Sequence, residues 1–185
     1  MPSPVYPIQT ARLALRSFAP GDLDDLFAYI SREDVVRYLY GGVKDRAESE
    51  QGLKLWMSST SLARAGERLV LAVVLVELNK VIGEVSLKCV SLEHRQAEIG
   101  WVFNPDYHGQ GFATEAAAAV LRLGFQEHNF HRILARCDAR NMASYKVMER
   151  LGMRREAHFI HNEFFKGEWG DELWYAILQS EWSKA

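Results

Sequence analysis

The sequence predicts one α/β domain built around a mixed sheet, and three observations support this fold class. The chain has 185 residues, which is the usual span of one domain with a sizeable core. Hydrophobic residues make up 48% and charged residues 25%, an ordinary composition for a globular protein. Segments with strand periodicity alternate with segments of helical periodicity, and no linker or internal repeat separates them. We therefore expect a single domain over residues 1–185.

The first half of the chain predicts one strand, two helices and a hairpin. Residues 12–18 alternate polar and apolar side chains, as a strand with one buried face does. Residues 22–30 carry their apolar side chains at helical spacing, and residues 46–65 form a second helical region. Residues 69–76 and 81–90 flank a short polar turn, so they predict a hairpin.

The second half continues with strands and helices in alternation. The glycine-containing stretch before residue 112 predicts a loop, and the alanine-rich stretch after it has apolar residues at helical spacing. In chain order we expect strand 96–103, loop 104–111, helix 112–127, strand 132–138, helix 142–151 and two strands, 154–165 and 171–181.

Charge and hydropathy exclude several classes of partner. The net charge is -2, from 22 basic and 24 acidic residues, whereas nucleic-acid binders are usually strongly basic. The first ten residues lack the charged and apolar regions of a signal peptide. The longest apolar run, 69–76, is far shorter than the ~20 residues of a membrane helix. We expect a cytoplasmic protein with no stable nucleic-acid partner and no membrane contact.

The cysteines and histidines predict neither a disulfide nor a metal site. Cys89 and Cys137 lie in apolar, strand-like runs, where cysteine acts as a small buried hydrophobe. His158 and His161 are three residues apart in a predicted strand, so they point to opposite faces and cannot easily share a metal. No cluster has the spacing of metal ligands, and we predict no bound metal.

The stretch 104–121 carries the most informative pattern. Gly109 and Gly111 directly precede a helix, and glycine allows positive φ and close approach of the backbone to a ligand. The free N–H groups and dipole at a helix N-terminus favour a phosphate or pyrophosphate there. The same pattern also suits a plain turn between strand and helix. A dinucleotide fingerprint is excluded because Thr114 stands where its third glycine would be, and the G-K-[ST] of a Walker loop is absent.

Several segments resemble the GCN5-related N-acetyltransferase (GNAT) superfamily. Residues 108–113 (HGQGFA) are similar to its acyl-CoA-binding motif [QR]-x-x-G-x-[GA], with His108 in place of Gln or Arg. Residues 138–153 resemble its motif N-x-x-S…E-x-L-G-[FM]. Residues 10–39 and 171–182 resemble the branch of ribosomal-protein N-terminal acetyltransferases (RimJ/RimL type).

The resemblance implies an N-acetyltransferase that takes acetyl-CoA as cosubstrate. It also implies a mixed, mostly antiparallel sheet of six to seven strands flanked by about four helices. Asn141 would lie beside the pantetheine arm, although taken alone it is an ordinary helix N-cap. By this resemblance the cofactor-binding residues are Trp101, Val102, Phe103, His108, Gly109, Gln110, Gly111, Phe112, Ala113, Thr114, Asn141 and Ser144.

Acyl transfer to an amine needs a base that keeps the amine neutral. We predict Glu98 as this base, because it lies centrally in strand 96–103 and resembles the glutamate base of histone-type members. A purely structural carboxylate is the alternative. Glu84 is the rival base, but it shares a face with Ser86 and Lys88, which favours a solvated or ion-paired state.

The prediction of the general acid starts from a position at which this sequence differs from the family. Many members have a tyrosine seven residues after the motif asparagine, a position that Met148 occupies here. We predict Ser144 as the substitute, since the resemblance places it near the leaving sulfur. An ordinary serine bonding back to its own helix is the alternative.

The acceptor amine is left open by the sequence. A protein N-terminus attacked in a ternary complex is the first prediction, and a small amine (aminoglycoside, polyamine or amino acid) is the second. A binding module without turnover is the third, and the acyl group itself is open. Four acidic residues would attract a cationic amine or form a solvated rim: Glu33, Asp34, Glu163 and Asp171. Exposed apolar helix faces permit a homodimer.

Overall fold

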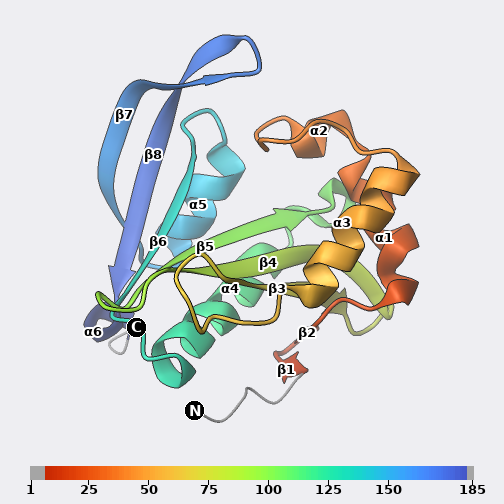
Figure 1. Ribbon diagram of the computed structural model, residues 1–185, viewed down its shortest axis with the longest axis horizontal. Coiled ribbons are helices and arrows are strands. Elements are labelled where there is room, and N and C mark those ends of the chain that lie inside the picture. The colour runs from red at the N-terminus through yellow and green to blue at the C-terminus, as the bar shows by residue number, and fades with distance from the viewer. Residues whose placement is uncertain (1–6, 183–185) are drawn as a thin grey trace.

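The structure, a computed structural model, describes residues 7–182 and contains one eight-stranded sheet (Figure 1). Residues 1–6, on which the expectation of no signal peptide partly rests, lie outside this range. The strands are β1 (Ile8–Gln9), β2 (Leu13–Arg16), β3 (Arg68–Leu75), β4 (Lys80–Ser91), β5 (Gln96–Phe103), β6 (Arg132–Asp138), β7 (Arg154–Phe165) and β8 (Glu168–Leu178). Their order across the sheet is β1-β2-β3-β4-β5-β6-β8-β7.

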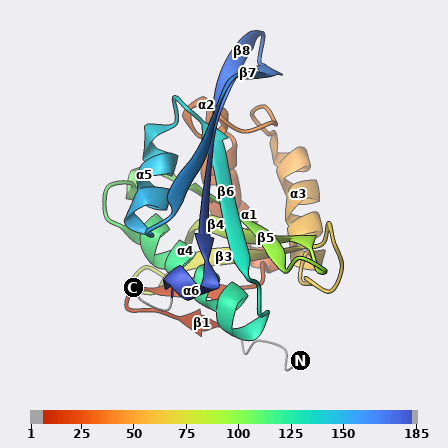
Figure 2. The same cartoon turned by 90° about the vertical axis from the view of Figure 1, so that its left-hand side faces the viewer.

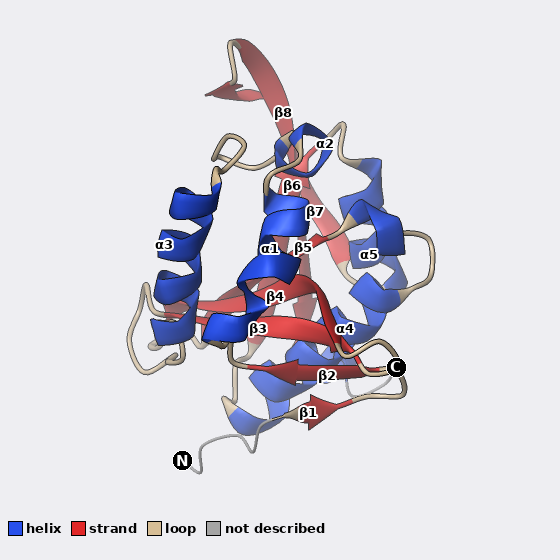
Figure 3. Ribbon diagram, turned by 90° about the vertical axis from the view of Figure 1, so that its right-hand side faces the viewer, coloured by secondary structure: helices blue, strands red, loops and turns tan. Residues whose placement is uncertain are grey.

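The helices lie on both faces of this sheet. They are α1 (Leu23–Ile30), α2 (Glu33–Val36), α3 (Arg46–Ser58), α4 (Phe112–Arg122), α5 (Met142–Arg150) and α6 (Gln179–Trp182). A 3-10 turn, η1 (Pro20–Asp22), precedes α1, another, η2 (Pro105–Tyr107), follows β5, and a π-helical turn, η3 (Leu123–Glu127), extends α4. In Figure 3, α1 and α3 lie in front of β3 and β4, while α4 lies behind them.

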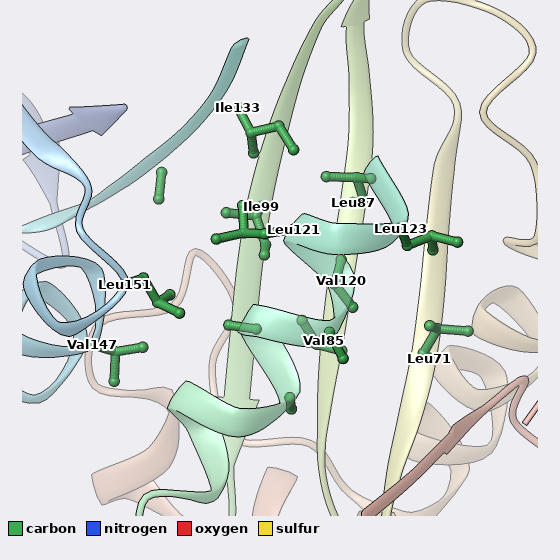
Figure 4. Packing of buried hydrophobic residues seen from close by; sticks show 14 of the residues in the cluster. Leu71, Val85, Leu87, Ile99, Val120, Leu121, Leu123, Ile133, Val147 and Leu151 are labelled. Atoms are coloured by element: carbon green, nitrogen blue, oxygen red, sulfur yellow. The ribbon is translucent and has the colours of Figure 1, made fainter. Parts of the chain in front are cut away.

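The two faces bury separate hydrophobic clusters. The larger one packs α4 and α5 against the central strands, with Leu87 and Ile99 facing Val120 and Leu121 (Figure 4). The smaller one packs α1 and α3 on the opposite face, around Tyr29. Each fully buried large apolar side chain contributes roughly 1.5–3 kcal/mol, so both helix layers are fixed to the sheet by burial.

All neighbouring strands are antiparallel except β5 and β6, which pair in parallel. That pairing covers only Gln96–Glu98 against Arg132–Leu134. Beyond Glu98 the two strands diverge, as Figures 1 and 2 both show. At the far edge, β7 and β8 form a long hairpin that extends beyond the rest of the sheet (Figure 2).

The predicted mixed α/β sheet is confirmed, and the structure corrects its details. The sheet has eight strands rather than six to seven, because the two-residue β1 is too short to show periodicity. The region predicted as helix 46–65 ends at Ser58 instead, since Ser59 and Thr60 already pair with β3. The last strand is Glu168–Leu178 rather than 171–181, and α6 follows it. The four-residue helices α2 and α6 raise the helix count above four.

Two further observations concern the cysteines and the length of the helices. Cys89 is buried and Cys137 half-buried, and both are free thiols. Over residues 7–182, no helix combines the length and apolar character needed to cross a membrane.

Candidate active site

The divergence of β5 from β6 creates the site. Beyond Glu98 the edge of β5 that faces β6 has no neighbouring strand among the described residues. Trp101, Val102 and Phe103 lie on this open edge. Apart from the Phe103 carbonyl oxygen, which contacts His108, the backbone groups on that side have no strand partner and can bind a ligand. A hollow lies on either side of this edge.

The first hollow, which we term the loop cleft, has a volume of about 1040 Å³. Residues of β5, η2, the start of α4 and α5 form its wall. All of the predicted cofactor-binding residues line it: Trp101, Val102, Phe103, His108, Gly109, Gln110, Gly111, Phe112, Ala113, Thr114, Asn141 and Ser144. Asp34, Tyr38 and two basic side chains, Lys146 and Arg150, line it as well.

The glycine loop, residues 108–111, lies in the conformation that an anion site requires. Gly109 has φ 77° and Gly111 has φ 83°, a region that favours glycine, and Gly111 is the N-cap of α4. His108, which stands in place of the motif's Gln or Arg, contacts the end of β5. Its Nε2 lies 3.1 Å from the carbonyl oxygen of Phe103, so it fastens the loop to the end of β5.

The loop cleft fits a diphosphate-containing ligand. The first N–H groups of α4 have no partner within the helix, and a helix N-terminus attracts negative charge. Thr114 Oγ1 in this first turn is buried and has no hydrogen-bond partner among the described residues. Lys146 and Arg150 add positive charge to the same cleft. An anion with several acceptor oxygens matches this set of donors.

The second hollow, which we term the inner cavity, has a volume of about 540 Å³. The loop 37–45, β4, β5, β6 and the β7–β8 hairpin surround it. It shares six residues with the loop cleft: Tyr38, Leu39, Trp101, Val102, Asn141 and Ser144. The two hollows therefore meet along β5 and the start of α5, where two bound molecules would come into contact.

Asn141 fixes the start of α5 at this meeting point. Its side-chain Oδ1 accepts the backbone N–H of Ser144 at 3.1 Å, which is the helix-capping role expected of the residue alone. Ser144 is half-buried and faces Cys137 of β6. Burial raises the pKa of the Cys137 thiol to about 12, so this thiol stays protonated and is a poor nucleophile.

Glu98 lies in an ion pair within the inner cavity. Its Oε1 accepts from Arg136 Nε at 2.9 Å. Arg136 also lies 3.2 Å from Glu172 and 3.8 Å from Glu163, so one guanidinium is shared by three carboxylates. Of these, Glu172 is the most buried, at 7% exposed, and also accepts from Asn162.

Glu84 has a different environment, and the sequence-based expectation for it was wrong. It forms no ion pair in the described part of the chain. Its Oε2 instead accepts from the hydroxyl of the fully buried Tyr29 at 3.3 Å. Burial raises the pKa of Glu84 to about 8, against the opposing effect of the Tyr29 hydrogen bond. Helix α1 packs over this face of β4, so Glu84 is half-buried beside the cavity and not on the solvated face that the strand pattern had suggested.

The four acidic residues expected at the acceptor site fall in different places. Glu163 lines the inner cavity, where the Tyr40 hydroxyl donates to it at 2.7 Å. Asp171 also lines it and lies 2.9 Å from His158 Nε2. Asp34 lines the loop cleft and pairs with Arg32. Glu33 lines neither hollow.

Sequence reasoning missed several residues of the site. In the sequence, Arg136 has the pattern of an ordinary polar residue in a strand. Tyr38 lies in a loop without periodicity. Lys146 and Arg150 are four residues apart on α5, and that spacing could have indicated a basic face beside the motif. Within residues 7–182, no group of three or more His, Cys, Asp or Glu side chains has an arrangement that could hold a metal ion.

Comparison with known proteins decides the family. The family model described as an acetyltransferase (GNAT) domain matches residues 12–154. The chain belongs to the GNAT acetyltransferase family. The predicted membership is thereby confirmed, and the GNAT protein is an N-acetyltransferase that takes an acyl-CoA as cosubstrate.

Full-length relatives support this membership. The GNAT protein is similar to the uncharacterised N-acetyltransferase YnaD of Bacillus subtilis, with 39% identity over 95% of this chain and 99% of the relative. It is also similar to a solved GNAT-family acetyltransferase from Bacillus anthracis. That structure has a TM-score of 0.85 and 37% identity, over 94% of this chain and 99% of the other.

Two more distant solved structures show the shared fold alone. One is a spermidine N-acetyltransferase from Vibrio cholerae in complex with CoA and spermine, with a TM-score of 0.78 and 23% identity over 94% of this chain and 99% of the other. The other is a putative ribosomal-protein-serine acetyltransferase from Vibrio cholerae. It has a TM-score of 0.76 and 20% identity over 95% of this chain and 99% of the other.

Proposed function

We propose that the protein transfers an acetyl group from acetyl-CoA to a small cationic amine by direct attack within a ternary complex. The observation that carries this proposal is the meeting of the loop cleft and the inner cavity at Trp101, Val102 and Ser144. A group held at the end of one hollow is exposed to a molecule held in the other. Such proximity converts a reaction between two molecules into one within a complex.

The loop cleft would hold the coenzyme. The N–H groups at the start of α4, with Lys146 and Arg150, suit the phosphates, and the open edge of β5 and Asn141 suit the pantetheine arm. When bound, the coenzyme supplies an activated acyl thioester. The backbone N–H groups of Trp101 and Phe103 lie on the open side of β5, and they would stabilise negative charge that develops there.

Glu84 is our proposed general base. Its raised pKa of about 8 lies close to a neutral working pH, where a general base is most effective. It lines the inner cavity, so its carboxylate can take a proton from an amine bound there, directly or through a water. Glu98 remains the base predicted from the sequence. Its ion pair with Arg136 gives better support to a structural role, in which it positions the wall of the inner cavity.

Ser144 is the proposed general acid. It lines both hollows, so its hydroxyl group would lie between the two bound molecules. Met148, at the position of the usual tyrosine, is buried at 1% exposed and carries no proton to give. Ser144 would donate a proton at the sulfur as the thiol is released.

The charge of the inner cavity favours a cationic acceptor. Its wall carries more carboxylates than cations. The carboxylates are Glu84, Glu98, Asp138, Glu163, Asp171 and Glu172, and the cations are Lys44, Arg68 and Arg136. Contacts between loop 37–45 and the β7–β8 hairpin also limit its size. Both features support a polyamine-like substrate, such as the spermine of the Vibrio cholerae structure, over an extended peptide.

A protein N-terminus is the second candidate acceptor. It is supported by the resemblance of residues 10–39 and 171–182 to the RimJ/RimL branch. An α-amino group is also a monocation that the acidic wall would attract. The homodimer and the cytoplasmic location stay predictions from the sequence.

Release of free CoA thiol tests the proposal directly. The purified protein is mixed with acetyl-CoA and a panel of polyamines, aminoglycosides, amino acids and N-terminal peptides. We expect turnover with polyamines, and a fall in kcat/KM of ~10²-fold or more in Glu84→Gln. Glu33→Gln, exposed and outside both hollows, is the control and should match the wild type.

Other results would redirect the proposal. Turnover on peptides alone would favour the second candidate. A larger loss in Glu98→Gln than in Glu84→Gln would return the role of base to Glu98. Tight CoA binding without thiol release from acetyl-, propionyl- or succinyl-CoA would indicate a binding module.

A further inference from the structure

Arg12 lies in the bend between β1 and β2 and contacts the glycine loop, which is about 100 residues away in the sequence. Its Nη1 donates to the carbonyl oxygen of Gln110 at 3.0 Å. Its guanidinium carbon lies 4.4 Å from the centroid of the Phe112 ring. Arg12 itself does not line the loop cleft. Arg12 would therefore act on a ligand there through its neighbours, the glycine loop and Glu115 of α4.

The contact with Gln110 orients a peptide group of the loop. In a trans peptide the C=O and the following N–H point in opposite directions. Because the Gln110 carbonyl points to Arg12, the N–H of Gly111 is turned away from Arg12. The loop is exposed and contains two glycines of positive φ, which have many accessible conformations when free. The Arg12 and His108 contacts hold it from its two ends.

Arg12 also neutralises a carboxylate in the first turn of α4. Glu115 lines the loop cleft, where an ionised side chain would repel a phosphate. The Arg12 guanidinium lies 2.7 Å from Glu115 Oε2, and the Arg12 backbone N–H donates to Oε1 at 2.9 Å. Thr10 donates to the same Oε1 at 2.6 Å. Burial opposes ionisation of Glu115, but these hydrogen bonds outweigh it and lower the pKa of Glu115.

We propose that Arg12 is a positioning residue for the acyl donor, which holds the glycine loop in its diphosphate-binding conformation and cancels the charge of Glu115. The inference rests on the proposed function, in that the loop cleft takes a coenzyme A thioester. It predicts that Arg12 acts on the phosphate end of the donor and not on the acyl end.

Calorimetry with CoA and initial-rate kinetics test this role in the full chain. We expect Arg12→Gln to raise the Kd for CoA and the KM for acetyl-CoA about tenfold, which corresponds to ~1.4 kcal/mol. The kcat at saturating acetyl-CoA should be retained. S-acetylpantetheine, which lacks the diphosphate, should be used equally well by wild type and variant. Arg46→Gln, an exposed arginine paired with Asp24 on another face, is the matched control.

A second variant separates charge from loop geometry. Adding Glu115→Gln to Arg12→Gln removes the uncovered carboxylate, so part of the CoA affinity should return. If Arg12→Gln does not fold, Arg12→Lys keeps the charge but loses the shared contacts to Gln110 and Glu115, and its Kd for CoA should still rise severalfold.

Three outcomes are informative in different ways. An unchanged Kd for CoA in the Arg12 variants would overturn the inference. An equal loss of activity with S-acetylpantetheine would also overturn it, since that would show a general structural role. Failure of the wild type to bind CoA would instead overturn the proposed function.

Discussion

At the scale of single residues, two glutamates on neighbouring strands acquire different chemistry from their neighbours. Glu98 and Glu84 both line the inner cavity. Glu98 pairs with Arg136 of β6, whose Nε lies 2.9 Å from Glu98 Oε1. Glu84 faces the Tyr29 hydroxyl under α1, and its pKa is raised to about 8. A general base works best when its pKa lies near the working pH. The environment of Glu84 therefore suits this role better than the environment of Glu98.

The pH dependence of catalysis follows from this pKa. The active form of Glu84 is the carboxylate, so kcat/KM should rise with pH and level off above about 8. Glu84→Gln should lose this rising limb along with most of the activity. Initial rates between pH 6 and 9.5 with a saturating donor measure it. A wild-type profile that is flat through this range would contradict the assignment.

The same shift predicts how stability depends on pH. A carboxyl group whose pKa rises from 4.5 to about 8 on folding binds more protons in the folded state than in the unfolded state. Stability therefore falls as pH increases between these two values. Glu84→Gln should be less sensitive, so its Tm should drop less between pH 5.5 and 8 than that of the wild type. A parallel drop in both proteins would argue against a buried, titrating Glu84.

At the scale of elements, the contact between β4 and β5 holds the open edge in place. Gly83 pairs with Phe103, and a Cβ on Gly83 would lie 2.5 Å from the carbonyl oxygen of Val102 and 2.8 Å from Phe103 Cδ1. Backbone cannot yield cheaply at such a distance. The absence of a side chain at Gly83 is therefore what lets these strands approach beside the site.

Two glycine substitutions should have opposite effects on the free energy of unfolding. Gly83→Ala should lower it by ~1–3 kcal/mol, because an added methyl group overpacks a tight contact. Gly52→Ala in α3, where no atom lies within 4 Å of the new Cβ, should raise it by ~0.5–1 kcal/mol through helix propensity. Urea unfolding measures both. Equal stability of the two variants would show that the β4–β5 contact is looser than described.

At the scale of the whole molecule, segments from the two ends of the chain close the inner cavity. Lys166 Nζ, in the turn of the β7–β8 hairpin, donates to the carbonyl oxygen of Val36 at 2.5 Å. Tyr40 donates to Glu163 of the hairpin at 2.7 Å, and its ring packs against Phe165. The cavity thus depends on contacts between residues more than 120 positions apart.

Loss of one such contact should affect the acceptor and spare the donor. Tyr40→Phe removes the hydroxyl that holds Glu163, so the KM for the amine should rise ~3–10-fold, in line with the ~0.5–1.5 kcal/mol of one hydrogen bond. The KM for acetyl-CoA should not change, since Tyr40 lies outside the loop cleft. Initial rates with each substrate varied measure this. Trp169→Phe, on the exposed outer part of the hairpin, is the control.

The local part of the site could be predicted from the sequence. The glycine loop, the helix after it and the Asn141 cap each depend on neighbouring residues, and all lie as expected. The partners of the charged groups could not be predicted. Arg12 meets Glu115 across 103 positions and Arg136 meets Glu98 across 38, and strand periodicity gives the face of a side chain but not what faces it.

The sequence by itself determined the order of the longer strands and helices, the family and twelve of the residues that line the loop cleft, because periodicity and motif spacing are local properties of a chain. Only the tertiary structure decided which carboxylate is buried and which is paired, and that the two hollows meet at Ser144. Burial and pairing depend on segments distant in sequence, and these two effects set the charge state of an acidic side chain.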